Sequence, residues 1–323
     1  MNEVYHIPAM LQETVEGLAI RPDGIYVDVT FGGGGHSRAI LANMHEAAKG
    51  QETGAKGHLY SFDQDADALQ NAIDDEQWTF VHSNFRYLHN WMDYYGVDHI
   101  DGLLADLGVS FHHFDCPERG FSFRFSAPLD MRMNQTAKRT AADIVNTYSA
   151  EELARLFYLY GELKNGRQIA TAICKARAQK QIARTEELVA AVLRCKPSDL
   201  GTSVELGELD IPTNAKKDLA RLFQALRIEV NDEMGALREM LVAARDLLRP
   251  GGRIAILTYH SLEDRLVKNF LRSGNLEGTI EKDFYGNNLS PFLLIEKGRE
   301  ASEQEVACNP RARSAKLRIA ERK

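Results

Sequence analysis

Short apolar runs rich in β-forming residues alternate with stretches of helical periodicity up to about residue 108. The runs lie at 25–29, 58–63, 78–82 and 100–106. Apolar residues at helical spacing follow the first two runs, and an aromatic-rich helical pattern follows the third. This alternation predicts a doubly wound α/β sheet, in which ligands bind beyond the carboxyl ends of the strands.

The alternation is interrupted by a segment with helical patterns alone. These patterns lie at 141–145, 149–161, 168–178 and 185–193. A single long helix is then expected over 222–248, and further strands at 253–259, 290–296 and 315–320. The last two strands predict the closing antiparallel pair that distinguishes a methyltransferase sheet from a dinucleotide-binding one. We therefore predict a class I (Rossmann-like) S-adenosylmethionine-dependent methyltransferase sheet from 1–108 and 222–323, with an inserted all-helical domain at 109–221.

Composition indicates where in the cell the protein is expected, but it says little about its chemistry. Hydrophobic residues make up 44% and charged residues 26% of the chain, as in ordinary globular proteins. No apolar run reaches membrane-spanning length, and the N-terminus lacks a signal-peptide pattern. The scattered cysteines fit reduced thiols better than a disulfide framework or a structural zinc site. These features predict a cytoplasmic protein without a membrane partner.

The strand at 25–29 runs directly into four glycines, Gly32 to Gly35. Such a turn lets a ligand approach the backbone at the start of the following helix. A dinucleotide fingerprint would need a third glycine at Ser37 or Arg38, so a pyrophosphate fits poorly. S-adenosylmethionine, which has no phosphate and needs a carboxylate for its ribose, fits better because Asp63 ends the next strand. Phe85 and Asp106 follow the later strands, and the switch-point rule places them at the same crevice.

Nearly the whole chain resembles the RsmH (MraW) family. The matching blocks include His6-x-Pro, Asp28-x-Thr-Phe-Gly-Gly-Gly-Gly-His-Ser37, Phe62-Asp-Gln-Asp65, Asn84-Phe85, Asp101-Gly-Leu-Leu-Ala-Asp-Leu-Gly-Val-Ser110, Pro117-Glu-Arg-Gly-Phe-Ser-Phe123, Leu129-Asp-Met-Arg-Met133, Tyr160-Gly-Glu162, Phe223-Gln-Ala-Leu-Arg-Ile-Glu-Val-Asn231, His260-Ser-Leu-Glu-Asp-Arg265 and Asn309-Pro-Arg-Ala-Arg-Ser314. The resemblance implies S-adenosylmethionine-dependent methylation of the exocyclic N4 amine of a cytidine in the decoding region of 16S ribosomal RNA. It also implies that the substrate is the assembled small ribosomal subunit.

The resemblance implies a set of cofactor contacts. Gly34, Gly35 and His36 would line the methionine side of the cofactor, Asp63 would bind the ribose, and Phe85 and Asp106 would flank the adenine end. His113 stands at a cofactor-contact position where the family usually has glutamine. A second departure is the segment 214–221, which replaces the family's usual His-Pro-Ala-x-Arg block.

A cytosine amine is a weak nucleophile, so an enzyme must hold it in line with the methyl group and accept hydrogen bonds from it. Asp106 and Ser110 follow strand 100–106 and are our candidate acceptors, with His260 after strand 253–259 as a second candidate. Helix or turn capping is an equally good interpretation of Ser110 and His260. Asp130 and Arg132 fit either a target pocket or an internal ion pair.

The segment after strand 100–106 contains residues suited to two other functions, metal binding and nucleophilic attack. His112, His113, Asp115 and Cys116 resemble a metal cluster, but adjacent histidines in an extended chain point to opposite sides. We therefore predict no metal. Cys116 could attack a cytosine ring carbon as a nucleophile, although its position in a loop favours a packing or surface role.

The chain has a net charge of −7, yet it contains two basic stretches. One comprises Lys164, Arg167, Lys175, Arg177, Lys180 and Arg184; the other comprises Arg311, Arg313, Lys316, Arg318, Arg322 and Lys323. Such stretches are usually solvated faces, but two of them in an acidic protein favour contact with RNA phosphates. We expect the inserted domain to dock on the RNA.

Other functions remain open at this stage. A DNA amino-methyltransferase is disfavoured because the expected proline pair is missing after strand 100–106. A non-catalytic ribosome-assembly factor with a methyltransferase fold is the alternative from a different class. The sequence also leaves a homodimer open.

Overall fold

The computed structural model describes residues 8–49, 57–109, 116–195 and 212–323. The chain packs into two compact units: unit 1 comprises Met1–Gly108 and Met234–Lys323, and unit 2 comprises Val109–Glu233. The first break coincides with the expected one after residue 108. The expected second break, between 221 and 222, falls inside helix α9 (Thr213–Asn231), which belongs entirely to unit 2.

Unit 1 is built on one seven-stranded sheet. Its strands are β1 (Ile25–Asp28), β2 (His58–Asp63), β3 (Trp78–His82), β4 (Ile100–Asp106), β5 (Leu248–Thr258), β6 (Phe292–Glu300) and β7 (Lys316–Arg322). They lie in the order β3-β2-β1-β4-β5-β7-β6. Strands β1 to β5 are parallel to one another, whereas β7 is antiparallel to both β5 and β6. The predicted methyltransferase-type sheet with a closing antiparallel pair is confirmed.

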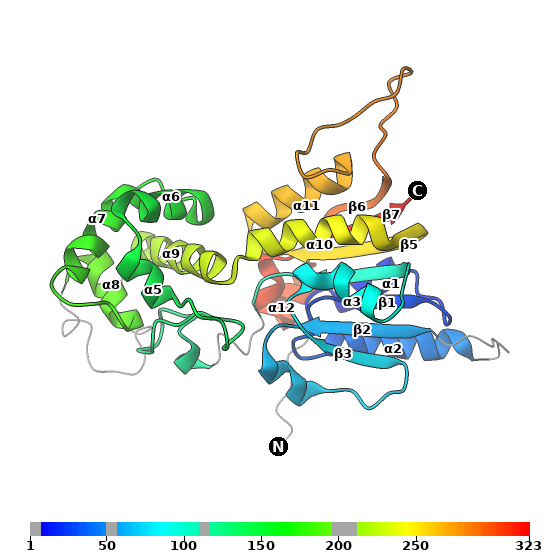
Figure 1. Ribbon diagram of the computed structural model, residues 1–323, viewed down its shortest axis with the longest axis horizontal. Coiled ribbons are helices and arrows are strands. Elements are labelled where there is room, and N and C mark those ends of the chain that lie inside the picture. Colours follow the sequence, from blue (N-terminus) through cyan, green and yellow to red (C-terminus); the bar gives the residue numbers. More distant parts are fainter. Residues whose placement is uncertain (1–7, 50–56, 110–115, 196–211) are drawn as a thin grey trace. The chain divides into compact units, whose positions relative to one another are not determined.

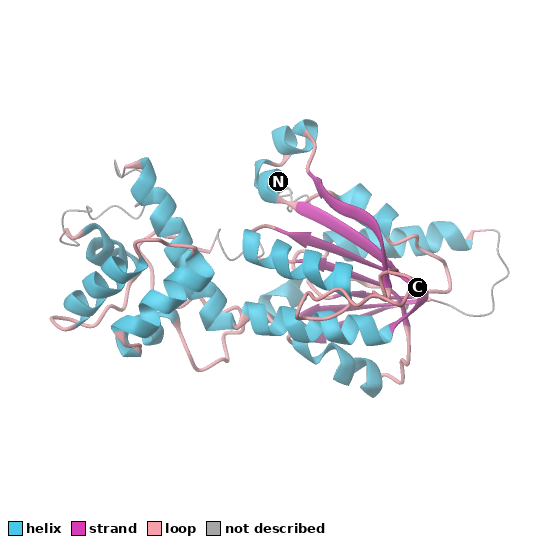
Figure 2. Ribbon diagram, turned by 90° about the horizontal axis from the view of Figure 1, so that it is seen from above, coloured by secondary structure: helices cyan, strands magenta, loops and turns pink. Residues whose placement is uncertain are grey.

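Helices lie on both sides of this sheet (Figure 2). They are α1 (Leu11–Gly17), α2 (Gly35–Ala48), α3 (Leu88–Tyr94), α10 (Glu233–Leu247), α11 (Ser261–Ser273) and α12 (Glu303–Cys308), with the 3-10 helices η1 (Ala66–Asn71), η2 (Phe85–Tyr87) and η6 (Pro310–Ser314). The helical pattern expected after the strand at 58–63 forms a 3-10 helix, η1. Because β4 and β5 are buried along nearly all of their paired length, both faces of the central strands must be covered.

One face of the sheet is covered by α1 and α2. Ile40, Leu41 and Met44 of α2 recur at helical spacing and pack with Leu59 of β2 and Leu257 of β5 in one cluster. These side chains hold the start of α2 against the carboxyl ends of the strands. The packing thus fixes the glycine turn that precedes α2.

Unit 2 is a helical domain, shown in green in Figure 1. Its helices are α5 (Ala141–Thr147), α6 (Ala150–Gly161), α7 (Gly166–Arg177), α8 (Thr185–Leu193) and α9, with the 3-10 helix η3 (Pro117–Arg119). A core of its own includes Ile144, Phe157 and Leu226. Ser149 caps α6 by accepting from the Glu152 N–H, and the Glu152 carboxylate accepts from the Ser149 N–H.

The expected single helix over 222–248 is wrong. The chain forms α9 and α10, and Asp232 between them has a φ of 47°. A left-handed residue ends a helix because it breaks the repeating hydrogen bonds. Leu222, Phe223 and Leu226 of α9 are buried in the core of unit 2, which is why this helix belongs to the inserted domain.

No helix within the described ranges is long and apolar enough to cross a bilayer. The four cysteines, all of which lie in those ranges, form no disulfide.

Candidate active site

The glycine turn joins β1 to α2 in a conformation that needs glycine. Gly32 and Gly34 have φ values of 50° and 75°, in the left-handed region. A Cβ on Gly34 would lie 2.9 Å from the Phe31 ring, and one on Gly35 would lie 2.2 Å from Cγ of Pro8. No side chain caps α2, so its first N–H groups point into the turn without a capping partner. Glycine is therefore required here by the close packing of Phe31 and Pro8 against the turn.

Asp63 connects the turn to the neighbouring strand. Its Oδ2 accepts a hydrogen bond from the Gly32 N–H at 2.8 Å, and its Oδ1 accepts one from the Asp65 N–H at 2.9 Å. The Asn71 side chain also donates to the Gly32 carbonyl at 3.0 Å. The carboxylate predicted to bind ribose thus lies beside the glycines predicted to line the methionine side.

Asp106 lies at the carboxyl end of β4 and is held from two directions. Tyr259 donates its hydroxyl hydrogen to Oδ1 at 2.6 Å, and His36 Nδ1 lies 3.7 Å from Oδ2. The Asp106 N–H donates to Thr30 Oγ1 at 2.7 Å. With a side chain that is 22% exposed, the carboxyl group is still reachable by a ligand.

The surroundings of Asp106 change its acidity. Burial raises its pKa to about 7; the Tyr259 hydrogen bond opposes this shift, and the negative charge of Glu263 adds to it. Burial also raises the pKa of Tyr259 well above its usual range, reinforced by the Asp106 charge. Tyr259 therefore remains a hydrogen-bond donor while Asp106 changes its protonation state near neutral pH.

A second buried carboxyl group, Asp28, lies behind the glycine turn. Ser37 Oγ donates to its Oδ2 at 2.6 Å, and the Thr30 N–H donates to its Oδ1 at 3.0 Å. Burial raises the pKa of Asp28, although the charge of His36 and these hydrogen bonds act against the rise. Burial lowers the pKa of His36, opposed by Asp28 and by the Ala9 backbone. The result is a neutral imidazole between two carboxyl groups at neutral pH.

Phe85 begins the turn η2 after β3 and is partly buried. Asn84 caps this turn by accepting a hydrogen bond from the Arg86 N–H at 3.0 Å, and its amide donates to Gln64 Oε1 at 2.8 Å. Gln64 directly follows Asp63. These contacts place the aromatic ring on the segment next to the predicted ribose carboxylate.

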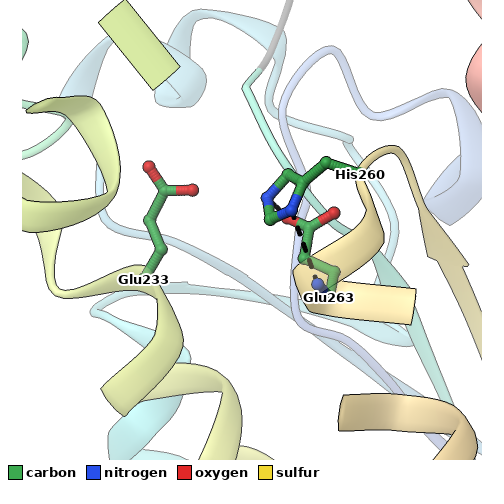
Figure 3. Close-up of side chains that lie close together, drawn as sticks. All are labelled: Glu233, His260 and Glu263. Carbon is green, nitrogen blue, oxygen red and sulfur yellow. Dashed lines mark hydrogen bonds and ion pairs between the residues drawn. The ribbon is translucent and has the colours of Figure 1, made fainter. Parts of the chain in front are cut away.

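His260 is the N-cap of α11 (Figure 3). Its Nδ1 accepts from the Glu263 N–H at 3.4 Å, and its Nε2 lies 3.0 Å from Glu263 Oε1. Glu263 also accepts from the Tyr259 N–H at 3.0 Å. The capping interpretation of His260 therefore describes its contacts here. Glu233, also drawn in Figure 3, pairs with Arg227 at 2.8 Å within unit 2.

Several expected residues lie outside the described ranges, namely Ser110, His113 and most of the proposed metal cluster, His112 to Asp115. Cys116 follows them and is partly buried. Asp130 and Arg132 form an ion pair at 2.7 Å, which is the second of the two interpretations given for them.

Five residues predicted to share one site lie at the adjoining carboxyl ends of β1, β2 and β4: Gly34, Gly35, His36, Asp63 and Asp106. Tyr259 and Asp28 also belong to the site, although the sequence did not predict them there. These residues fit S-adenosylmethionine, because the N–H groups at the start of α2 carry no side-chain cap and carboxylates suit its hydroxyl groups and its positive charge. The same carboxylates would repel a pyrophosphate.

This chain is similar to known proteins over nearly its full length. The family model described as the MraW methylase family matches residues 3–323. A ribosomal RNA small subunit methyltransferase H from Parabacteroides distasonis is 57% identical, covering 99% of this chain and 98% of that protein. One from Phocaeicola vulgatus is 55% identical, covering 100% of this chain and 99% of that protein. An rRNA methylase structure from Streptococcus thermophilus aligns over 99% of this chain and 98% of that chain at 12% identity, with a TM-score of 0.39. The fold assignment therefore rests on strand order rather than on that likeness.

Proposed function

Because the chain belongs to the MraW methylase family, we propose that it methylates the N4 amine of a cytidine in the decoding region of 16S rRNA. The methyl donor is S-adenosylmethionine, and the substrate is the small ribosomal subunit in the cytoplasm. One observation supports this proposal above the others. The glycine turn, followed by a helix without a side-chain cap, lies next to Asp63 and Asp106 at the carboxyl ends of neighbouring strands.

The glycine turn and its neighbours hold the cofactor. Gly34, Gly35 and His36 would lie beside its methionine portion, Asp63 would accept hydrogen bonds from its ribose, and Phe85 would flank its adenine. Asp106, whose Oδ2 lies 3.7 Å from His36 Nδ1, would lie toward the methyl group. When bound, the cofactor supplies a methyl group on a positively charged sulfur. The protein's part is to fix the position of that group relative to the amine.

Asp106 accepts a hydrogen bond from the cytidine amine when it is ionised. With a pKa of about 7, roughly half of the molecules carry this charge at neutral pH. Tyr259 fixes the orientation of the carboxylate through its 2.6 Å hydrogen bond. Ser110 is the second acceptor in this proposal. His260 is a third candidate, although its ring nitrogens already face Glu263.

The two basic stretches differ in how many of their cations are already engaged within the protein. At the C-terminus, Arg318 pairs with Asp264 at 2.8 Å, Lys316 pairs with Glu300 at 3.3 Å, and Arg322 donates to a backbone carbonyl at 3.3 Å. These cations support β7 within the sheet. Arg311 is engaged as well. In the stretch of unit 2, Lys180 and Arg184 pair with Glu187 and Glu186, and Arg177 donates to the Val145 carbonyl. The C-terminal stretch therefore has one more of its six cations engaged than the stretch of unit 2.

In the basic stretch of unit 2, three exposed cations lie on α7 or just before it. Arg167 and Lys175 are exposed and eight positions apart on this helix, so they lie on one face, and Lys164 precedes it. None of the three has an ion pair within the described part of the chain. Tyr158 on the adjoining helix α6 is 67% exposed and offers a ring for base stacking. This face supports RNA contact by unit 2.

The first experiment is methyl transfer from labelled S-adenosylmethionine to small subunits that lack the modification, followed by nucleoside analysis. We expect label in N4-methylcytidine, lost in Asp106→Ala and retained in the control Asp93→Asn, whose carboxylate is 63% exposed on α3. Label in 5-methylcytidine would instead implicate a nucleophile such as Cys116. An absence of both labelling and cofactor binding would refute the enzyme and favour a non-catalytic assembly factor.

A second experiment tests the RNA face. Arg167→Ala/Lys175→Ala should lower the salt dependence of subunit binding, since each lost phosphate contact reduces the log–log slope by about 0.9. Arg313→Ala, an exposed cation of the C-terminal stretch, serves as the comparison. An unchanged slope in the double variant would contradict a phosphate role for α7.

A further inference from the structure

Residues 275–289 form an arm that projects from unit 1 between α11 and β6 (Figure 1). Two aromatic residues occupy its tip: Phe284 is 98% exposed and Tyr285 is 85% exposed. Their rings contact each other edge to face at 5.7 Å between centroids. Aromatic side chains left this exposed lose favourable burial, so an adjacent pair at the end of a projection indicates a contact surface.

The tip is locked by its own hydrogen bonds. The Asp283 carboxylate accepts from the backbone N–H groups of Tyr285 and Asn287 at 2.9 and 2.8 Å, and from the Asn287 side chain at 2.8 Å. Gly286 completes the turn with a φ of 85°. Behind the tip, the Leu289 N–H donates to the Glu281 carbonyl at 2.9 Å. The aromatic pair is thus held in place before any partner binds, which lowers the entropy lost on association.

The base of the arm is fixed to the body of unit 1. Asn288 donates to the Arg272 carbonyl at 3.0 Å, and Ser290 Oγ donates to the Leu271 carbonyl at 3.3 Å, both at the end of α11. The Asn275 side chain donates to the Thr279 carbonyl and accepts from the Thr279 N–H. The arm is therefore built to hold its tip at a set place on the body.

Apolar exposure continues from the arm onto the sheet edge. Leu289 is 56% exposed, and Leu293 and Ile295 of β6 are 52% and 44% exposed. Exposed and partly buried positions alternate along β6, so Leu293 and Ile295 share the outward side of this edge strand. We call the exposed apolar side chains of the arm and of β6 the arm surface (Phe284, Tyr285, Leu289, Leu293 and Ile295).

The charges of the arm select the type of partner. Glu277, Glu281 and Asp283 are opposed only by Lys282, a net charge of −2 from three acidic groups and one basic group. RNA phosphates would be repelled by this balance, whereas a positively charged protein surface would be attracted. The basic face of α7 shows the opposite character.

We propose that the arm surface docks on a basic protein of the small ribosomal subunit, with the aromatic pair inserted into that protein. The inference rests on the proposed function, because it takes the assembled subunit as the substrate. It divides the recognition between two surfaces: the cations of unit 2 contact RNA, and the acidic, aromatic arm contacts protein. Such an arm adds affinity without touching the reacting groups, so its loss raises KM and leaves kcat unchanged.

Photocrosslinking identifies the partner directly. p-Benzoylphenylalanine replaces Tyr285 in the full chain, and in a control it replaces Tyr94, which is 76% exposed on α3. With small subunits lacking the modification, we expect a crosslink from position 285 that protease removes and ribonuclease does not, and none from position 94. A crosslink to RNA, a crosslink to a second copy of this chain, or equal crosslinking at the two positions would each overturn the proposal.

Kinetics provide the second test. Phe284→Ser/Tyr285→Ser should raise KM for small subunits roughly tenfold or more, the loss typical of truncated aromatic anchors, with kcat and the dissociation constant of S-adenosylmethionine unchanged. Tyr94→Ser should behave as wild type. An unchanged KM in the double variant overturns the arm proposal while wild-type activity is intact, whereas an inactive wild-type protein would instead refute the proposed function.

Discussion

Replacing Asp106 by asparagine should stabilise unit 1 increasingly as pH rises. An amide has the size of the carboxyl group and can still accept the Tyr259 hydrogen bond, but it cannot ionise. In the wild-type protein the buried carboxyl group has a pKa of about 7, whereas the ordinary pKa of an aspartate is 3.8. The native state therefore holds this proton up to a higher pH than the unfolded chain does.

The sign and the size follow from proton linkage. Below pH 3.8 the group is protonated in both states; as pH rises toward 7 the unfolded chain loses the proton first, and native stability falls. A shift of about 3 units corresponds to about 4 kcal/mol for the complete change. Between pH 5 and pH 8 the same relation gives a loss of about 2.5 kcal/mol in the free energy of unfolding.

Tryptophan fluorescence can isolate this effect, because both tryptophans, Trp78 and Trp91, lie in unit 1. Urea unfolding of wild type and Asp106→Asn at pH 5, 6, 7 and 8 gives the difference in free energy of unfolding at each pH. Titrating groups remote from the site contribute equally to both proteins and cancel, whereas the Asp106 charge also raises the pKa of Asp28, so the loss of that effect is part of the measured difference. A difference that stays constant across this range would show that Asp106 ionises normally and would refute the reasoning.

Two further substitutions test the geometry of the site. Tyr259→Phe removes the hydrogen bond that lowers the Asp106 pKa, so the inflection in the pH profile of kcat/KM should move above about 7. The control is Tyr148→Phe, which breaks an equally short 2.6 Å bond to a carboxylate in unit 2. This control should leave the pH profile unchanged. Gly35→Ala puts a Cβ within 2.2 Å of Pro8 Cγ, so we expect the free energy of unfolding, measured by urea titration, to fall by about 1–3 kcal/mol. Calorimetry should also show weaker cofactor binding. A wild-type affinity for the cofactor would show that the turn has room to relax.

The strands could be predicted because a sheet covered on both faces demands short, continuous apolar runs. Strand β4 has the predicted limits, Ile100 and Asp106, since a polar residue ends the buried run. The division of the 222–248 helix could not be predicted. Apolar spacing near 3.6 continues on both sides of Asp232, and a left-handed conformation at a residue other than glycine leaves no mark in the pattern.

Tyr259 could not be assigned to the site from sequence for a related reason. Its role depends on the register in which Asp106 pairs with Leu257, two residues before the tyrosine. Register is set by packing across the whole sheet, so a side chain that reaches over from a neighbouring strand is visible only in three dimensions. The signal for this role in the sequence is that Tyr259 lies at the end of a strand expected to neighbour the strand of Asp106.

The position of β7 has a consequence for how the protein is made. This strand is synthesised after every other strand of the sheet, yet it lies between β5 and β6. While the nascent chain emerges, β6 has no neighbour to pair with, and the edge of β5 stays open. Vectorial folding can therefore assemble the strands up to β5, but the sheet closes only when Leu317 and Ile319 arrive to fill its core. Premature termination just before Lys316 would remove an interior strand of the sheet and leave two unpaired edges exposed to aggregation.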